Sequence, residues 1–232
     1  MEGGLLSSEE LKAFAKDYVR FAHVTTKIDG RAHDDLMERK GGTGFPYVAT
    51  MNADGRVIAT LGLGGRDLAG LEAMMKAGAA YEAKRAKADR TDAETAELLA
   101  FDVGVGNVTP EEARKTLASL DLDEDAADEL DMAIADVEIA AVLATIRSRD
   151  DLPVVGEKLA AMMSEGKIPT DAGRAVRFYA AIIAYAERAR DLPAFEKALA
   201  ALARRAERDG GARRIVEQKQ PVLDALKAEA EK

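Results

Sequence analysis

Residues 41–64, with the sequence GGTGFPYVATMNADGRVIATLGLG, decide the fold of the first part of this chain. Pro46 can open a strand, because a missing N–H does no harm to the pairing there. Two runs of alternating side chains, at 47–51 and 57–61, have the pattern of half-buried strands. The turn sequence Asn52-Ala53-Asp54-Gly55 lies between them, and its glycine suits the left-handed conformation that closes such a turn. These features predict a β-hairpin.

The predicted hairpin has helical and extended segments on both sides. Before it, the sequence predicts a helix at 8–16 with a capping box at Ser7-Ser8-Glu9-Glu10, then a strand at 19–28 and a helix at 33–39. The predicted strand is rich in β-branched residues and has apolar or small residues on both faces, as a strand covered on both sides has. A closing helix is predicted at 66–87.

This order of elements resembles the C-terminal half of a thioredoxin-like domain. The motif that carries the resemblance is G-x-G-F-P-Y-V, residues 42–48, followed by the x-D-G turn. In that family the proline before the hairpin is cis and lies against the active-site dithiol. The resemblance therefore implies a cis Phe45–Pro46 bond and a peptide-binding loop at Gly44, Phe45, Pro46 and Tyr47. The alternative is another α+β domain that contains a hairpin.

Two departures from the family concern its chemistry. The chain has no cysteine, so the Cys-x-x-Cys dithiol is absent, and thiolate attack on a disulfide needs a cysteine sulfur. The segment that would carry the dithiol would also precede Ser8, where only MEGGLLS stands. Either this lineage does without the dithiol, or the coding segment lies upstream of Met1. Whether the protein is an enzyme stays open.

The second half of the chain contains an internal repeat. Asp151-Leu152-Pro153 and Asp191-Leu192-Pro193 lie 40 residues apart, and at the same offset residues 135–146 align with 175–186. A looser copy precedes them, with an apolar run at 98–101 and the capping sequence Thr109-Pro110-Glu111-Glu112. A helix, a loop, a proline and a second helix repeated with this period are typical of stacked helical hairpins.

The repeat resembles the tetratricopeptide class in size and alanine content, although its period is longer and the aromatic signature is missing. The alternative is an irregular helical bundle. The predicted architecture is thus an incomplete thioredoxin-like α/β domain, with a small sheet and flanking helices, at 1–88. An all-α helical-hairpin repeat domain follows at 89–232.

Charge is distributed unevenly along the chain. The net charge of −9 comes from the second half, since residues 1–88 have 13 basic and 12 acidic side chains and residues 89–232 have 20 and 30. An acidic helical half argues against nucleic acid as a partner, because phosphate binding needs a basic face. No apolar run reaches the roughly 20 residues of a membrane span. Cytoplasm is the default compartment, and the periplasm or secretion is expected if an upstream signal has been lost.

Other candidate sites have simpler explanations. His23, in the predicted strand, is either a ligand or a half-buried histidine with a backbone partner, and the second is favoured; His33 is expected to be a solvated residue at a helix start. With no spacing to other ligands the two histidines predict no zinc site. Asp121, Asp123 and Asp125 resemble a calcium loop that lacks its glycine and its glutamate, so they predict an acidic helix start. No metal or cofactor is expected.

Two further patterns bear on anion binding. The segment Gly104-Val105-Gly106 lacks the residues of a phosphate loop. The arginines at 204–214 are expected to pair with acidic neighbours. The sequence therefore predicts a non-catalytic protein that binds or scaffolds a peptide or protein, with no prediction of oligomeric state. The alternative is the C-terminal portion of a thiol–disulfide oxidoreductase.

Overall fold

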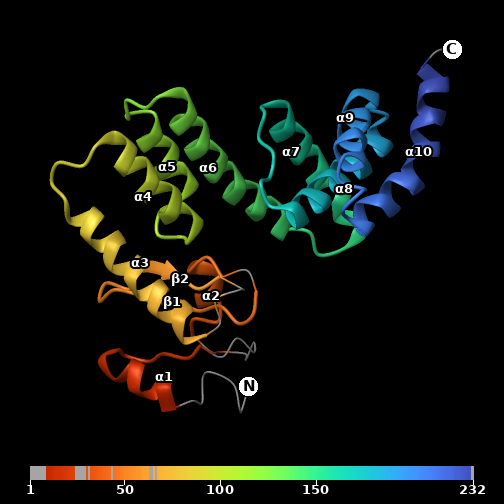
Figure 1. Cartoon of the computed structure of the whole chain (residues 1–232). Coiled ribbons are helices and arrows are strands. Elements are labelled where there is room, and N and C mark those ends of the chain that lie inside the picture. The colour runs from red at the N-terminus through yellow and green to blue at the C-terminus, as the bar shows by residue number, and fades with distance from the viewer. Residues whose placement is uncertain are drawn as a thin grey trace. The chain divides into compact units, whose positions relative to one another are not determined.

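The computed structural model describes residues 9–23, 30, 32–42, 44–62, 65 and 67–230. These residues are mostly helical, with one two-stranded antiparallel sheet (Figure 1). The chain divides into two compact units, Met1–Leu130 and Asp131–Lys232. Helix α6 (Glu124–Ala144) contributes to both units.

The first unit contains the sheet and the helices that precede α6. Its elements are α1 (Glu9–Phe14), the 3-10 helix η2 (Ala15–Asp17), α2 (Leu36–Arg39), β1 (Ala49–Met51), β2 (Val57–Thr60), α3 (Leu68–Ala86), α4 (Asp92–Gly104) and α5 (Pro110–Leu117).

The predicted hairpin is confirmed, with strands shorter than the alternating pattern. Ala49 lies opposite Thr60, and an irregularity in the register follows Thr50. In the turn, the Asn52 carboxamide oxygen accepts hydrogen bonds from two backbone N–H groups, and Gly55 has a φ of 74°. Local turn chemistry therefore sets the direction of the chain here, as the sequence predicted.

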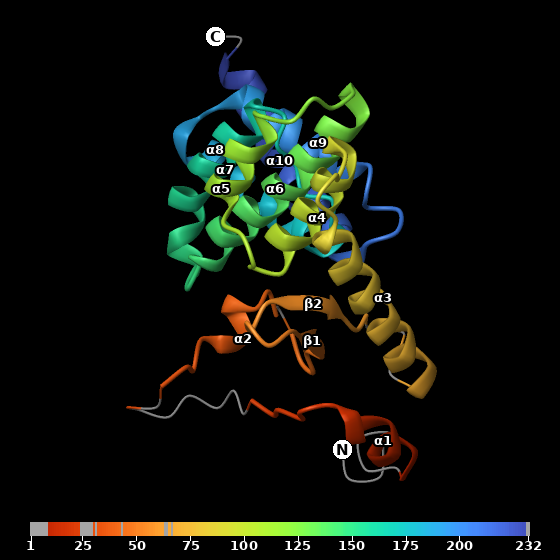
Figure 2. The ribbon, with the colours of Figure 1, turned by 90° about the vertical axis from the view of Figure 1, so that its left-hand side faces the viewer.

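The hairpin packs against the predicted closing helix. β2 buries Val57 and Ala59. From α3, Leu71 and Met74 form one apolar cluster with Ala59. Helix α1 adds partly buried apolar side chains to this cluster. Figure 2 shows α3 beside the two strands. A two-stranded hairpin is marginal alone, so this packing is what holds it.

The predicted strand at 19–28 is wrong for the part that the structure describes. Residues 19–23 are irregular, and Val19 is 99% and Phe21 65% exposed. β-branched residues favour a strand only where cross-strand and same-face neighbours pack against them, and no described strand pairs with 19–23. Residues 24–28, and Ser7 of the predicted capping box, lie outside the described residues.

The helices of this unit are shorter than the sequence predicted. The helix expected at 33–39 begins only at Leu36, because His33 adopts a left-handed φ of 69° that interrupts a helix. The helix expected at 8–16 appears as α1 followed by η2, and the closing helix as α3. The order of these helices around the hairpin follows the prediction.

The second unit is helical throughout its described part. Besides the end of α6, it contains η3 (Arg149–Asp151), α7 (Leu152–Ser164), α8 (Ala172–Ala189), α9 (Leu192–Ala203) and α10 (Gly210–Ala230).

The predicted pattern of helix, loop, proline and helix is confirmed. A proline occupies one of the first two positions of α5, α7 and α9, where its missing N–H has no intrahelical partner to lose. The predicted capping box between Thr109 and Glu112 forms at the start of α5. Along the chain, a proline therefore marks the second helix in each of three successive couples, α4 and α5, α6 and α7, and α8 and α9.

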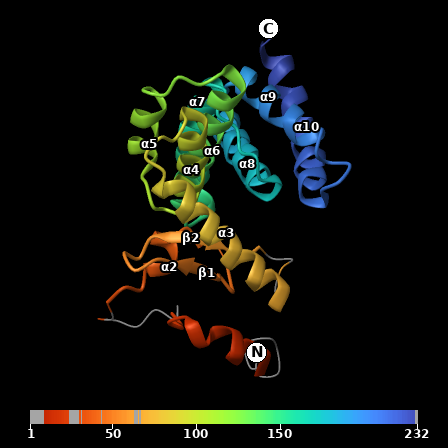
Figure 3. The same ribbon diagram turned by 60° about the vertical axis from the view of Figure 1, so that its left-hand side comes forward.

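Consecutive helices of the second unit pack on one another, α7 on α8, α8 on α9, and α9 on α10 (Figure 3). Phe178 of α8 and Phe195 of α9 are fully buried. Gly156 lies where α7 meets α8, and a Cβ built there would be 2.0 Å from the carbonyl oxygen of Ala181. The two helices approach so closely that only glycine fits at this position.

Helix α10 has an apolar inner face and a charged outer face. Ala212, Leu223 and Leu226 are buried, whereas the outward positions are exposed and mostly charged or polar. Exposed ion pairs also connect the helix to the preceding helices, including Lys227–Glu196 at 2.7 Å and Arg190–Glu229 at 2.6 Å. Burial of the apolar face holds α10, since exposed ion pairs stabilise little.

The division into units falls at Leu130 rather than at the predicted boundary of residues 88 and 89. The physical reason is a side-chain contact between β2 and the loop after α4. The carboxamide of Asn107 accepts from the backbone N–H of Val57 at 3.0 Å and donates to its carbonyl at 2.7 Å. Helix α4 and its loop therefore belong with the hairpin.

Candidate functional site

The loop that precedes β1 is the site that the sequence predicted. The Phe45–Pro46 bond is cis, as the resemblance implied. Gly44 and Phe45 are exposed, the latter by 66%, while Pro46 and Tyr47 are half-buried. The four predicted residues are contiguous, and the loop presents an aromatic ring to solvent directly before a strand.

Contacts from three directions hold this loop. The Tyr47 hydroxyl donates to the carbonyl of Lys40, and the Lys40 ammonium donates to the carbonyl of Gly55 in the hairpin turn. A Cβ on Gly42 would lie 2.5 Å from Cγ of Met37, so α2 packs directly on the loop. These contacts hold the backbone around Phe45 in place.

Two glycines bring this loop against the turn after α4. Gly41, with φ 75°, would place a Cβ 2.7 Å from Cα of Val105, and Gly106, with φ 73°, would place one 2.6 Å from the carbonyl oxygen of Arg39. Both positive φ values and both close approaches favour glycine. The segment Gly104-Val105-Gly106, weighed above as a phosphate loop, serves here as a packing surface.

The outer edge of β1 continues from the loop. Val48 accepts a hydrogen bond from Leu61, and Asn52 donates one to Arg56, so alternation directs the N–H and C=O groups of Ala49 and Met51 away from β2. In the described part of the chain no strand pairs with this edge. Met51 is 39% exposed at its end. An unpaired strand edge can accept another chain in the extended conformation.

The outer edge of β2 differs, because Asn107 already bonds both backbone groups of Val57. One side-chain amide thus takes the place of a neighbouring strand at this residue. The outward backbone groups of Ala49 and Met51 on β1 have no such side-chain partner among the described residues.

A cleft of about 400 Å³ lies where β2, α3 and α4 meet. Its walls are mostly apolar, with Ile58 from the strand and Phe101 from α4, and the ion pair between Lys84 and Glu97 lies at its polar end. Its volume falls within the range of small-molecule sites. Only Tyr81 links this cleft to the polar cluster described next.

That polar cluster surrounds Asp102, the one buried charged side chain among the residues described. A single carboxylate oxygen, Oδ1, accepts from Arg56 at 2.9 Å, Tyr81 at 2.6 Å and Asn107 at 2.8 Å. Arg56 directly precedes β2, Tyr81 belongs to α3, and Asn107 lies in the loop after α4. Buried charges are tolerated when they are paired and hydrogen-bonded in this way, and the cluster joins the hairpin to α3 and α4.

Burial, together with the hydrogen bond to Asp102, raises the pKa of Tyr81 from 10.0 to about 12. Between pH 10 and about pH 12 the Tyr81 hydroxyl is therefore deprotonated in the unfolded chain and protonated in the folded chain. The free energy of unfolding should therefore fall as pH rises through this window. Titration of tyrosinate absorbance should show one group near pH 12 that is missing from Tyr81→Phe. A wild-type-minus-variant difference that titrates near 10 would contradict this.

The structure describes both histidines and the acidic run that the sequence singled out. His23 is half-buried, and neither ring nitrogen has a hydrogen-bond partner, so the expected backbone partner is not found. His33 is exposed before α2, as predicted. Asp123 accepts from the backbone N–H of Ala126 at the start of α6, which confirms an acidic helix start. Within the described ranges no cluster of metal-binding side chains occurs.

The expected pairing of the arginines at 204–214 with carboxylates is wrong. Arg205 lies over the ring of Tyr179 at 5.4 Å, and Arg213 donates to main-chain carbonyls. The nearby Asp209 is occupied in capping α10. Throughout the stretch 67–230 no carboxylate pairs with the remaining three, Arg204, Arg208 and Arg214.

A comparison of the chain with models of protein families, with curated proteins and with solved structures finds no match. The site therefore has to be interpreted from its own geometry. Of the helices that the structure describes, none is long and apolar enough to cross a membrane.

Sequence reasoning found the loop at 44–47 but missed the cluster around Asp102. A signal was present, since Asp102 stands inside the apolar run 98–103 of α4. An acidic residue within an apolar run must find donors when the helix packs. What the sequence could not supply is the identity of those donors, which come from 5 to 46 residues away.

Proposed function

We propose that this chain is a non-catalytic binding protein whose open β1 edge, together with the loop at Gly44, Phe45, Pro46 and Tyr47, holds an extended segment of a partner polypeptide. In this proposal the first unit is a thioredoxin-like domain without its dithiol. The second unit is a tetratricopeptide-like array that supplies a further protein-binding surface.

The unpaired edge of β1 is the observation that carries the proposal. A partner segment added there would bond the outward groups of Ala49 and Met51 and pack its side chains near Phe45. Main-chain hydrogen bonds provide affinity in strand addition, and neighbouring side chains provide selectivity. The support of the loop by Lys40 and Tyr47 keeps the cost of ordering low.

The arrangement of the second unit supports the tetratricopeptide-like part of the proposal. Its helices pack in chain order, and α7 and α9 both have a proline as their second residue, 40 residues apart. Arrays of this kind bind polypeptides along their stacked faces.

The test begins with short peptides selected from a random library on the immobilised full chain. On adding a selected peptide, the amide protons of Ala49 and Met51 should gain protection from hydrogen exchange, because they become bonded. The amides of Val48 and Thr50, which face β2, should change less. Phe45→Ser should weaken binding by about tenfold, since one buried aromatic contact is worth at least 1.4 kcal/mol.

Val154→Ser is the matched control, because Val154 is similarly exposed, at 59%, and lies on α7. This variant should bind the same peptide as the wild type does. Equal losses in both variants, or protection confined to residues 131–230, would rule out the β1 edge as the site.

A further inference from the structure

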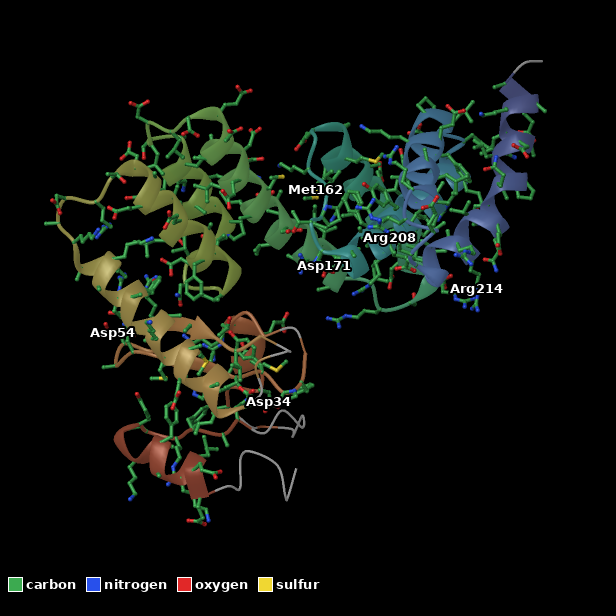
Figure 4. All side chains as sticks on the ribbon, viewed as in Figure 1. Asp34, Asp54, Met162, Asp171, Arg208 and Arg214 are labelled. Atoms are coloured by element: carbon green, nitrogen blue, oxygen red, sulfur yellow. The ribbon has the colours of Figure 1, made fainter. Side chains whose placement is uncertain are left out.

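The turn between α9 and α10, together with the first residues of α10, contains a cluster of basic side chains. Residues 204–214 contain five arginines against Glu207 and Asp209, in a chain of net charge −9. Figure 4 labels two of them, Arg208 and Arg214. We call the three exposed arginines that lack a carboxylate partner the arginine corner; they are Arg204, Arg208 and Arg214.

Several other cations of this unit are paired across helices. Arg174 meets Asp136 at 3.2 Å, and Lys219 meets Glu187 on α8. The arginine corner differs from these cations, because its three arginines without a carboxylate partner lie together within residues 204–214. Its backbone is nonetheless held in place, because Arg213 bonds the carbonyls of Ala206 and Glu207. The corner therefore presents three uncompensated charges from a supported turn.

The same chain carries a surface of opposite sign at the start of α6. Residues 121–129 contain six acidic residues and no basic one. All six are exposed, and within the described stretch 67–230 no lysine or arginine pairs with them. We call this segment the acidic helix start.

We infer that the arginine corner of one copy of this chain binds the acidic helix start of a second copy. Charge complementarity supports this occupant, because both surfaces are exposed and each lacks a partner of opposite charge. A nucleic acid is less favoured, since a polyanion would approach a chain that is itself strongly negative. The contact joins two different surfaces, so it is a head-to-tail interface.

The experiment measures self-association of the full chain by sedimentation velocity at low ionic strength. The wild type should associate with increasing concentration, and added salt should reverse this by screening. A corner variant, with Arg204→Glu, Arg208→Glu and Arg214→Glu, should associate at least about tenfold more weakly. A helix variant, with Asp125→Lys, Asp128→Lys and Glu129→Lys, should do the same.

Mixing the two variants is the decisive step. In each variant alone, the two surfaces that would meet carry charge of the same sign. In the mixture an acidic surface can again meet a basic one, so association should return. A control with the same change in net charge, Arg149→Glu with Lys158→Glu and Arg188→Glu, should associate about as well as the wild type. Circular dichroism should show that all variants keep their helical content, because none of the substituted side chains has a partner among the residues that the structure describes.

Three results would overturn the inference. These are a wild type that stays monomeric at low ionic strength, a corner variant that associates as the wild type does, or a mixture that fails to associate. The mixture could fail to associate while the wild type binds a single-stranded oligonucleotide and the corner variant does not. In that case the corner is a nucleic-acid site and the self-association proposal is wrong.

Discussion

Asp102→Ala is expected to lower the free energy of unfolding of the first unit by about 3 kcal/mol. The substitution leaves the Arg56 guanidinium, whose side chain is only 23% exposed, without its counter-ion. It also removes the acceptor for the Tyr81 hydroxyl and for the Asn107 amide. Donors left unpaired in a partly buried place cost more than the pairs themselves contribute.

Native-state hydrogen exchange on the amides of β2 is the suitable measurement, because it reports on the first unit alone. Asp102→Asn should lie between the wild type and Asp102→Ala, since it keeps an acceptor and loses the charge. Asp54→Ala is the control, an exposed aspartate in the hairpin turn. A loss for Asp102→Ala no larger than that for Asp54→Ala would show that the cluster contributes little to stability.

Gly156→Ala is expected to destabilise the second unit by about 3 kcal/mol. In an unobstructed helix the same substitution would stabilise by about 1 kcal/mol, because alanine is the better helix former. Here the added Cβ would lie 2.0 Å from the Ala181 carbonyl oxygen and 2.8 Å from Cβ of Tyr185. Helices α7 and α8 would have to separate, and the sign of the effect would be reversed.

Gly173→Ala provides the comparison within the same unit. A Cβ at Gly173 would meet only the Asp171 carboxylate, at 3.5 Å, so this change should be neutral or slightly stabilising. Urea unfolding followed by circular dichroism measures both variants. Similar stability of the two would mean that α7 and α8 can relax apart without cost.

The parts of the fold that could be predicted are those set by short-range chemistry. Asn52 and Gly55 determine the hairpin turn within four residues, and the prolines that open α5, α7 and α9 act through their own backbone. The strand expected at 19–28 is a different case. Val19 and Phe21 are residue types that favour strands, but no strand pairs with them in the described part of the chain. The sequence alone does not reveal whether a partner strand is available.

The candidate site divides in the same way. The loop at Phe45 could be predicted because Pro46 marks the start of a strand, and the residues involved are adjacent in the chain. The partners of Asp102 could not, since Arg56 and Tyr81 reach it only through tertiary packing. The predicted pairing of the arginine corner with carboxylates is wrong for a related reason. Glu207 and Asp209 are near in sequence, but Asp209 caps a helix and does not pair with an arginine.

The charged outer face of α10 has a consequence for how this protein could change in evolution. A helical hairpin gained by duplication needs an apolar neighbour on which to stack. The outer face of α10 offers exposed charges instead, whereas the junctions between α7, α8 and α9 already bury apolar residues on both sides. A duplicated 40-residue segment would therefore be accommodated before α10, so that new repeats should arise in the interior of the array.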